Sequence, residues 1–139
     1  MIINGDGLIV GRVATVAAKK ALLGEKIDIV NCENMVLTGK KKFILASQLQ
    51  KFKRGIHTKG PFVPRMPDRF VRRMIRGMLP YKQARGAEAY DRIMCYIGIP
   101  ESFKDKDMET IQEAHVSKMK NLNYMKVGDV VKLIGGNYE

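Results

Sequence analysis

Short apolar runs alternate along the chain with stretches of helical periodicity, and this alternation restricts the fold more than any other feature. Two of the runs, residues 27–30 and 93–97, are almost continuously apolar. Such runs are typical of strands buried on both faces of a largely parallel sheet. Four strands are predicted, at residues 1–3, 27–30, 35–37 and 93–97. The pattern indicates an α/β fold with helices on both sides of the sheet.

Five helices are predicted between and after these strands. The first is rich in alanine at helical spacing and ends at Gly24, while the third is entered through Pro67 and closed by Gly77 and Pro80. The helices are expected at residues 11–23, 41–54, 68–78, 87–92 and 127–134. Residues 101–126, most of them polar, are predicted to form an irregular surface segment.

The length of 139 residues suits a single domain over residues 1–139, which buries roughly two-thirds of its unfolded surface. Cys32 and Cys95 lie far apart, form no CxxC pair, and are expected to be reduced, buried thiols of a cytoplasmic protein. No apolar run is long enough to span a bilayer, and the N-terminus lacks the positive region of a secretory signal.

Positive charge is concentrated in the middle of the chain. The net charge is +11, and residues 40–92 carry 15 lysines and arginines against three acids, whereas the remainder is almost neutral. A solvated surface would scatter both signs, and this segregation favours a polyanionic partner.

The third predicted helix carries two opposed stripes. Apolar residues at helical spacing predict one face that packs in the core: Val71, Met74, Ile75 and Met78. Arginines at i, i+3, i+4 and i+7 predict the outward face: Arg69, Arg72, Arg73 and Arg76. Arginine binds phosphate oxygens bidentately and stacks on bases, so this face is predicted to contact a phosphate backbone.

Flanking basic residues extend this prediction. The full set of predicted RNA-binding residues is Lys40, Lys41, Lys42, Lys53, Arg54, His57, Lys59, Arg65, Arg69, Arg72, Arg73, Arg76, Lys82, Arg85 and Arg92. Phe62, Phe70 and Tyr81 are candidates for stacking on bases, although each also fits a place in the core. Asp68 is expected to cap the arginine-bearing helix.

Lys40, Lys41 and Lys42 stand at a helix start, where the macrodipole prefers anions. Functional sites often depart from local sequence preferences of this kind, and a helix N-terminus readily binds a phosphate. Three solvated lysines at a small energetic cost explain the pattern equally well, and the sequence alone does not separate the two interpretations.

No catalytic or metal-binding motif is present, so neither a catalytic residue, a metal nor a cofactor is predicted. The nearest approach is Gly5-Asp-Gly-Leu-Ile-Val-Gly11 with Glu33 about twenty residues on, which is one residue longer than a dinucleotide fingerprint. A small α/β enzyme with a nucleotide cofactor is therefore the rival hypothesis, and a general nucleic-acid packing protein is a third.

Two sequence motifs of this chain resemble those of a known protein family. They are Asp6-Gly-Leu-Ile-Val-Gly-Arg-Val-Ala-Thr15, and the central series Gly60-Pro61, Arg65-x-Pro67-x-Arg69, Val71 to Pro80, Lys82, Arg85-Gly86 and Gly98-Ile-Pro100. With them the chain resembles the L-thirteen family of large-subunit ribosomal proteins in its archaeal and eukaryotic form. The long basic C-terminal extension of eukaryotic relatives is absent, which favours an archaeal source.

The resemblance implies a three-layer α/β/α fold with a four-stranded, mostly parallel sheet. It implies a structural constituent of the large ribosomal subunit that binds large-subunit rRNA during early assembly. It further implies neighbouring large-subunit ribosomal proteins as partners, a cytoplasmic location in the large subunit, and no enzymatic activity, small-molecule substrate or membrane.

Overall fold

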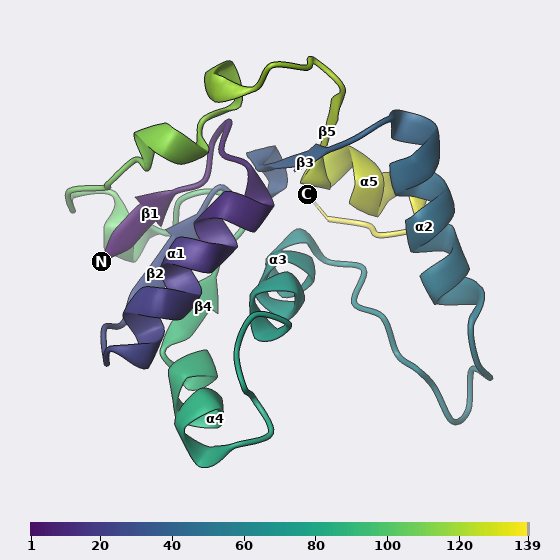
Figure 1. Cartoon of the computed structure of the whole chain (residues 1–139), viewed down its shortest axis with the longest axis horizontal. Coiled ribbons are helices and arrows are strands. Elements are labelled where there is room, and N and C mark those ends of the chain that lie inside the picture. Colours follow the sequence, from purple (N-terminus) through teal and green to yellow (C-terminus); the bar gives the residue numbers. More distant parts are fainter. Residues whose placement is uncertain (139) are drawn as a thin grey trace.

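Three short parallel strands form the central sheet of the computed structural model, which describes residues 1–138. The strands lie in the order β1 (Ile2–Asn4), β2 (Ile27–Val30) and β4 (Ile93–Cys95), as Figure 1 shows. Ile2 pairs with Asp28, and Ile27 with Ile93. All four residues of β2 are buried, as its continuous apolar pattern predicts for a central strand.

The prediction of a fourth strand in this sheet is wrong. β3 (Val36–Thr38) instead pairs antiparallel with β5 (Tyr124–Lys126) in a separate two-stranded sheet. Asn31, in the left-handed conformation at φ 56°, turns the chain out of β2, and the Val36 amide then donates to the Leu8 carbonyl at 2.8 Å. These contacts direct β3 away from the parallel sheet.

All five predicted helices are present, with bounds that shift by up to three residues. The structure places them as α1 (Val10–Leu22), α2 (Lys41–Lys53), α3 (Pro67–Arg76), α4 (Ala84–Asp91) and α5 (Val127–Leu133). The alanine-rich face of α1 is buried against α3 and α4, because small side chains allow helices to approach closely. α5 buries its valines beside the 3₁₀ turn that follows β2, Cys32–Asn34.

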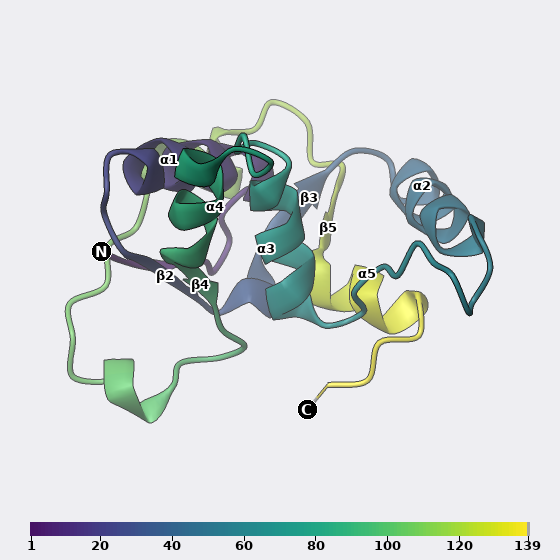
Figure 2. The same ribbon diagram turned by 90° about the horizontal axis from the view of Figure 1, so that it is seen from below.

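The two faces of the parallel sheet are covered differently. Figure 2 shows α1 and α4 on one side of β2 and β4, and the segment that follows β4 on the other. On that second side, Tyr96 donates to the Asp28 carboxylate at 3.4 Å and packs edge-on against Phe103. The second helical layer of the expected α/β/α arrangement is therefore replaced by a segment of 3₁₀ turns.

Residues 101–126 contain three 3₁₀ turns, Glu101–Phe103, Gln112–Ala114 and Val116–Lys118, and end in β5. The segment is mostly exposed, but Ala114 is buried and its carbonyl accepts from the Ile9 amide at 2.8 Å. Within residues 1–138, no helix is both long and apolar enough to cross a membrane.

We call residues 41–66, α2 and the loop that follows it, the arm. α2 has no buried residue, and in Figure 1 it stands apart from the parallel sheet. Three apolar residues lie on one side of this helix: Leu45 and Phe52 are half-buried, whereas Leu49 is exposed. The arm thus forms a wall beside α3 and meets the main core only at its edge, through Ile44 and Leu45.

Candidate nucleic-acid interface

α3 has an apolar inner side, on which Phe70, Val71 and Ile75 are buried. Of the four arginines predicted to face outward, only Arg69 is exposed, whereas Arg72, Arg73 and Arg76 are half-buried. Two details of the predicted inner face are wrong: Met74 is only half-buried and Met78 is 45% exposed. The helix ends at Arg76, so Met78 lies in the following turn, and the buried Phe70 takes its place in the core.

Asp68 lies within the first turn of α3 and not at the cap position, which Met66 occupies. Its carboxylate still accepts a hydrogen bond of 2.7 Å from the Arg69 amide. An acid at this end of a helix complements the macrodipole. Asp68 is therefore engaged by the helix backbone, and no ion pair joins it to an arginine in the described part of the chain.

Arg72 turns from the stripe onto the protein. Its Nε donates to the Ile93 carbonyl at 2.9 Å, Nη2 reaches the Tyr90 carbonyl at 3.4 Å, and the guanidinium lies 4.3 Å from the Tyr90 ring centroid. Ile93 belongs to β4, the edge strand of the sheet. Arg72 thus satisfies an edge carbonyl that another strand would otherwise pair with.

Arg73 and Arg76 are half-buried at the sides of the stripe. Arg73 Nη1 donates to the Phe62 carbonyl at 2.8 Å, which ties the arm to α3. The Arg76 guanidinium lies 4.8 Å from the centroid of the Tyr81 ring. Each arginine is held by one neutral partner, so its charge stays uncompensated while its side chain is ordered.

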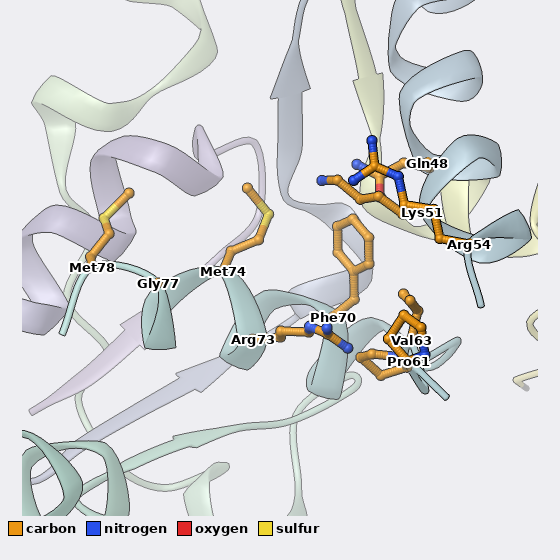
Figure 3. Close-up of a pocket in the computed structure, with 11 residues that line it drawn as sticks. Gln48, Lys51, Arg54, Pro61, Val63, Phe70, Arg73, Met74, Gly77 and Met78 are labelled. Carbon is orange, nitrogen blue, oxygen red and sulfur yellow. The ribbon is translucent and has the colours of Figure 1, made fainter. Parts of the chain in front are cut away.

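A groove with a volume of about 550 Å³ separates the arm from α3. Figure 3 shows Phe70 and Met74 on its floor, with Lys51 and Arg54 from the arm facing them and Arg73 on the near wall. Among the residues that the structure describes, no carboxylate lines it. An apolar floor between cationic walls suits a nucleotide, whose base is apolar on its faces and whose phosphate is anionic.

The remaining arm and loop candidates are exposed: Lys53, Arg54, His57, Lys59, Arg65, Lys82 and Arg85. Arg65 also lies over the Phe52 ring at 5.1 Å. Of the predicted stacking residues, Phe62 is 72% exposed and Tyr81 is 42% exposed, whereas Phe70 belongs to the core.

Arg92 is the candidate that forms an ion pair within residues 1–138. It forms an ion pair with Glu88 at 3.4 Å and donates to the Ala21 carbonyl at 3.3 Å, so it closes the end of α1 against α4. Only two other ion pairs occur within residues 1–138, and neither involves a candidate residue. We give the name arginine surface to ten exposed or half-buried cations: Lys51, Lys53, Arg54, Lys59 and Arg65 of the arm, Arg69, Arg73 and Arg76 of α3, Lys82 of the turn before α4, and Arg85 at the start of α4.

The lysines at 40–42 lie elsewhere. They stand exposed where the chain enters α2, at the end of the arm remote from the loop 54–66 (Figure 1). Lys40 lines a different groove, together with Arg12, Lys118 and Lys120. The structure therefore does not bring Lys40 to Lys42 together with the arginine stripe.

Contacts within the protein engage the residues that resemble a dinucleotide fingerprint. A side chain at Gly5 would collide with Met35 and the Val30 carbonyl, so this glycine serves close packing. The Glu33 carboxylate, the proposed ribose ligand of the rival hypothesis, accepts from the Gly98 amide at 3.1 and 3.2 Å. No cluster of potential metal ligands occurs among the residues that the structure describes.

Cys32 and Cys95 are both free and buried. The neighbouring Cys95 thiol, together with burial, raises the pKa of the Cys32 thiol. A raised pKa keeps the thiol protonated and unreactive, in agreement with the predicted structural role.

The sequence of this chain matches a family of known proteins. The family model described as "Ribosomal protein L13" matches residues 1–102. The chain belongs to the ribosomal protein L13 family. The proteins of this family are constituents of the ribosome and not enzymes, and the match confirms the resemblance to the L-thirteen family predicted from the sequence.

Relatives from archaea cover nearly the whole chain. A protein named large ribosomal subunit protein uL13 from Methanopyrus kandleri is 41% identical over 136 residues, which are 96% of this chain and 86% of the relative. Proteins of the same name from Methanosarcina barkeri and Methanococcoides burtonii are 39% and 37% identical, each over 99% of both chains. These matches identify the archaeal type of L13.

Sequence reasoning missed several cations of this L13-family chain. Lys51 lies within a predicted helix and lines the groove between the arm and α3. Arg12, Lys118 and Lys120 come from two distant segments and meet only in the folded chain. Lys51 falls inside the basic region 40–92 and could have been found there, whereas the other three lie in near-neutral sequence.

Proposed function

We propose that this chain binds large-subunit rRNA through the arginine surface and supports early assembly of the large ribosomal subunit in the cytoplasm. Neighbouring large-subunit ribosomal proteins complete the proposed set of partners. Its membership of the L13 family supports the ribosomal role. The proposed RNA contacts include Lys53, Arg54, His57, Lys59, Arg65, Arg69, Arg73, Arg76, Lys82 and Arg85, with Lys51 added from the groove.

The main support for rRNA binding is the lack of internal carboxylate partners for the arginine surface within residues 1–138. The described part of the chain supplies no carboxylate partner to the arginine surface, although the side chains of Arg73 and Arg76 are already ordered by neutral groups. Burying or crowding like charges is unfavourable unless another molecule neutralises them. Phosphates of a folded RNA supply those charges, and the concave space between the arm and α3 suits a backbone segment.

Arg72 and Arg92 are assigned a different part in this proposal. Both are held by backbone carbonyls of the protein: Arg72 secures α3 against β4 and α4, and Arg92 secures the end of α4 against α1. Their charges add to the surface potential, but their main contribution is to fix the scaffold that presents the arginine surface.

The role in early assembly rests on independent folding. The chain has its own core, with fully buried side chains contributed by α1, α3, α5 and both sheets. A protein that folds without partners can bind rRNA before other proteins arrive. Depletion of the protein from cells should therefore cause accumulation of an early large-subunit precursor, and accumulation of only late precursors would contradict this part.

Filter binding at about 150 mM KCl tests the RNA specificity. A transcript of archaeal large-subunit rRNA should bind more tightly than small-subunit rRNA or duplex DNA of equal length. Equal affinity for all three would favour a general packing protein, because contacts with phosphates alone do not discriminate strongly. Isothermal titration with NAD should show no saturable binding; binding that Glu33→Gln abolishes would revive the enzyme hypothesis.

A further inference from the structure

A second basic groove lies between the start of α1, the link from β3 to α2, and the segment before β5. It has a volume of about 730 Å³, larger than the groove beside α3. The side chains that give it its chemistry are Arg12, Lys40, Lys118, Lys120, Asn121 and Asn123. They come from three segments that are far apart in the sequence.

Backbone and side-chain hydrogen bonds hold the walls of this groove together. The Gly39 amide donates to the Asn123 carbonyl at 2.9 Å, and Arg12 Nη1 donates to the Glu113 carbonyl at 2.6 Å. The groove is therefore formed in the folded protein before any ligand binds, which lowers the entropic cost of binding.

Its chemistry suits the backbone of RNA. Four cations line it, and no carboxylate from residues 1–138 does. Lys40, Lys118 and Lys120 are exposed, and none of them joins an ion pair within residues 1–138. Lysines bind phosphates as point charges, and the asparagine amides can donate to phosphate oxygens or exchange hydrogen bonds with 2′-hydroxyls.

The groove and the α4 end of the arginine surface lie at opposite edges of the molecule. In Figure 1 the yellow-green segment before β5 follows the upper edge, whereas α4 and the turn before it lie at the lower edge. α2 connects the two surfaces, because Lys40 at its start lines the groove, whereas Lys51 and Arg54 near its end belong to the arginine surface.

We propose that this groove binds the phosphate backbone of a second rRNA segment, so that the chain joins two segments of folded rRNA. The proposal rests on the rRNA-binding function proposed above and extends it. It also gives a role to the lysines at the start of α2, whose position opposes the helix macrodipole. Two-site contact raises the affinity for RNA in which both segments are correctly placed, because the second contact becomes intramolecular.

Hydroxyl-radical footprinting on a transcript of archaeal large-subunit rRNA tests the proposal with full-length variants. The test variant combines Lys118→Gln and Lys120→Gln in the groove. Its matched control combines Lys104→Gln and Lys106→Gln, which remove the same charge from the same segment outside the groove. A third variant, Arg54→Gln with Arg69→Gln, weakens the arginine surface, and far-UV circular dichroism checks that all three are folded.

The expected result is two separable footprints. The Lys118/Lys120 variant should lose protection over one set of nucleotides, the Arg54/Arg69 variant over another, and the control over neither. The proposal is overturned if the Lys118/Lys120 variant keeps the full wild-type footprint or loses the same nucleotides as the Arg54/Arg69 variant. If the wild-type protein protects no nucleotides at all, the proposed rRNA-binding function fails as well, so the two failures are distinguishable.

Discussion

Arg69 and Arg72 stand on the same helix and look equivalent in the sequence, yet the structure gives them opposite roles. Arg69 is exposed, its backbone amide donates to the Asp68 carboxylate, and its side chain forms no hydrogen bond to another residue within 1–138. Arg72 holds the edge of the sheet through its bonds to the Ile93 and Tyr90 carbonyls. Arg72→Ala should therefore reduce stability, whereas Arg69→Ala should reduce rRNA affinity and leave stability unchanged.

The stability loss can be worked from the contacts of Arg72. A hydrogen bond from a charged donor contributes about 1.5–3 kcal/mol, and the longer bond to Tyr90 adds little. Stacking over the Tyr90 ring contributes about 0.5–1 kcal/mol at a partly exposed site. The substitution should thus cost about 2–4 kcal/mol, a large part of the 5–15 kcal/mol that typically stabilises a domain.

Urea unfolding followed by far-UV circular dichroism measures this difference, since the chain contains no tryptophan for fluorescence. With a urea dependence of about 2 kcal/mol/M, the midpoint of Arg72→Ala should fall by about 1–2 M. The midpoint of Arg69→Ala should stay within about 0.3 M of the wild type. Equal midpoints for Arg72→Ala and the wild-type protein would refute the structural role of Arg72.

Three further predictions concern the core, a tight turn and a tyrosine. Ile75→Asp should prevent folding because Ile75 is fully buried. Met74→Asp should leave a folded domain with a lower unfolding midpoint, because Met74 only lines a groove. Circular dichroism distinguishes these outcomes, and a stable Ile75→Asp variant would contradict the packing of α3. Gly86→Ala should cost about 1–3 kcal/mol in urea unfolding, since its methyl group would collide with the backbone of the preceding turn, and an unchanged midpoint would show that the turn can move. Burial and the Asp28 carboxylate raise the pKa of Tyr96, so its stabilising contribution should be complete below pH 10 and be lost as the pH rises through its folded pKa. Ultraviolet difference titration should find that Asp28→Asn lowers the pKa of Tyr96, and an unchanged value would contradict the contact.

The elements of the fold follow from local patterns, but their pairing does not. The continuous apolar run of β2 and the alanine spacing of α1 are sufficient to predict a central strand and a packed helix. The partner of β3 could not be predicted in the same way, because β5 is three residues long and follows a polar segment. Its pairing is decided by contacts between positions almost ninety residues apart, such as Leu37 with Met125.

The candidate site was predictable where it lies on one helix. Helical spacing alone separates the basic face of α3 from its apolar face. Spacing does not show which arginines turn back onto the protein, because the partners of Arg72 and Arg92 are carbonyl groups supplied by other elements. It also cannot assemble the groove of Arg12, Lys118 and Lys120, whose residues meet only after folding.

The salt dependence of rRNA binding tests the central claim most directly, because counterion release counts the phosphates that a protein neutralises. Each lost phosphate contact reduces the slope of log Kobs against log[KCl] by about 0.7–0.9. Arg54→Gln with Arg69→Gln should therefore make the slope for an archaeal large-subunit rRNA transcript shallower than wild type by about 1.5. An identical slope for the variant and the wild-type protein would show that the arginine surface does not contact the RNA backbone.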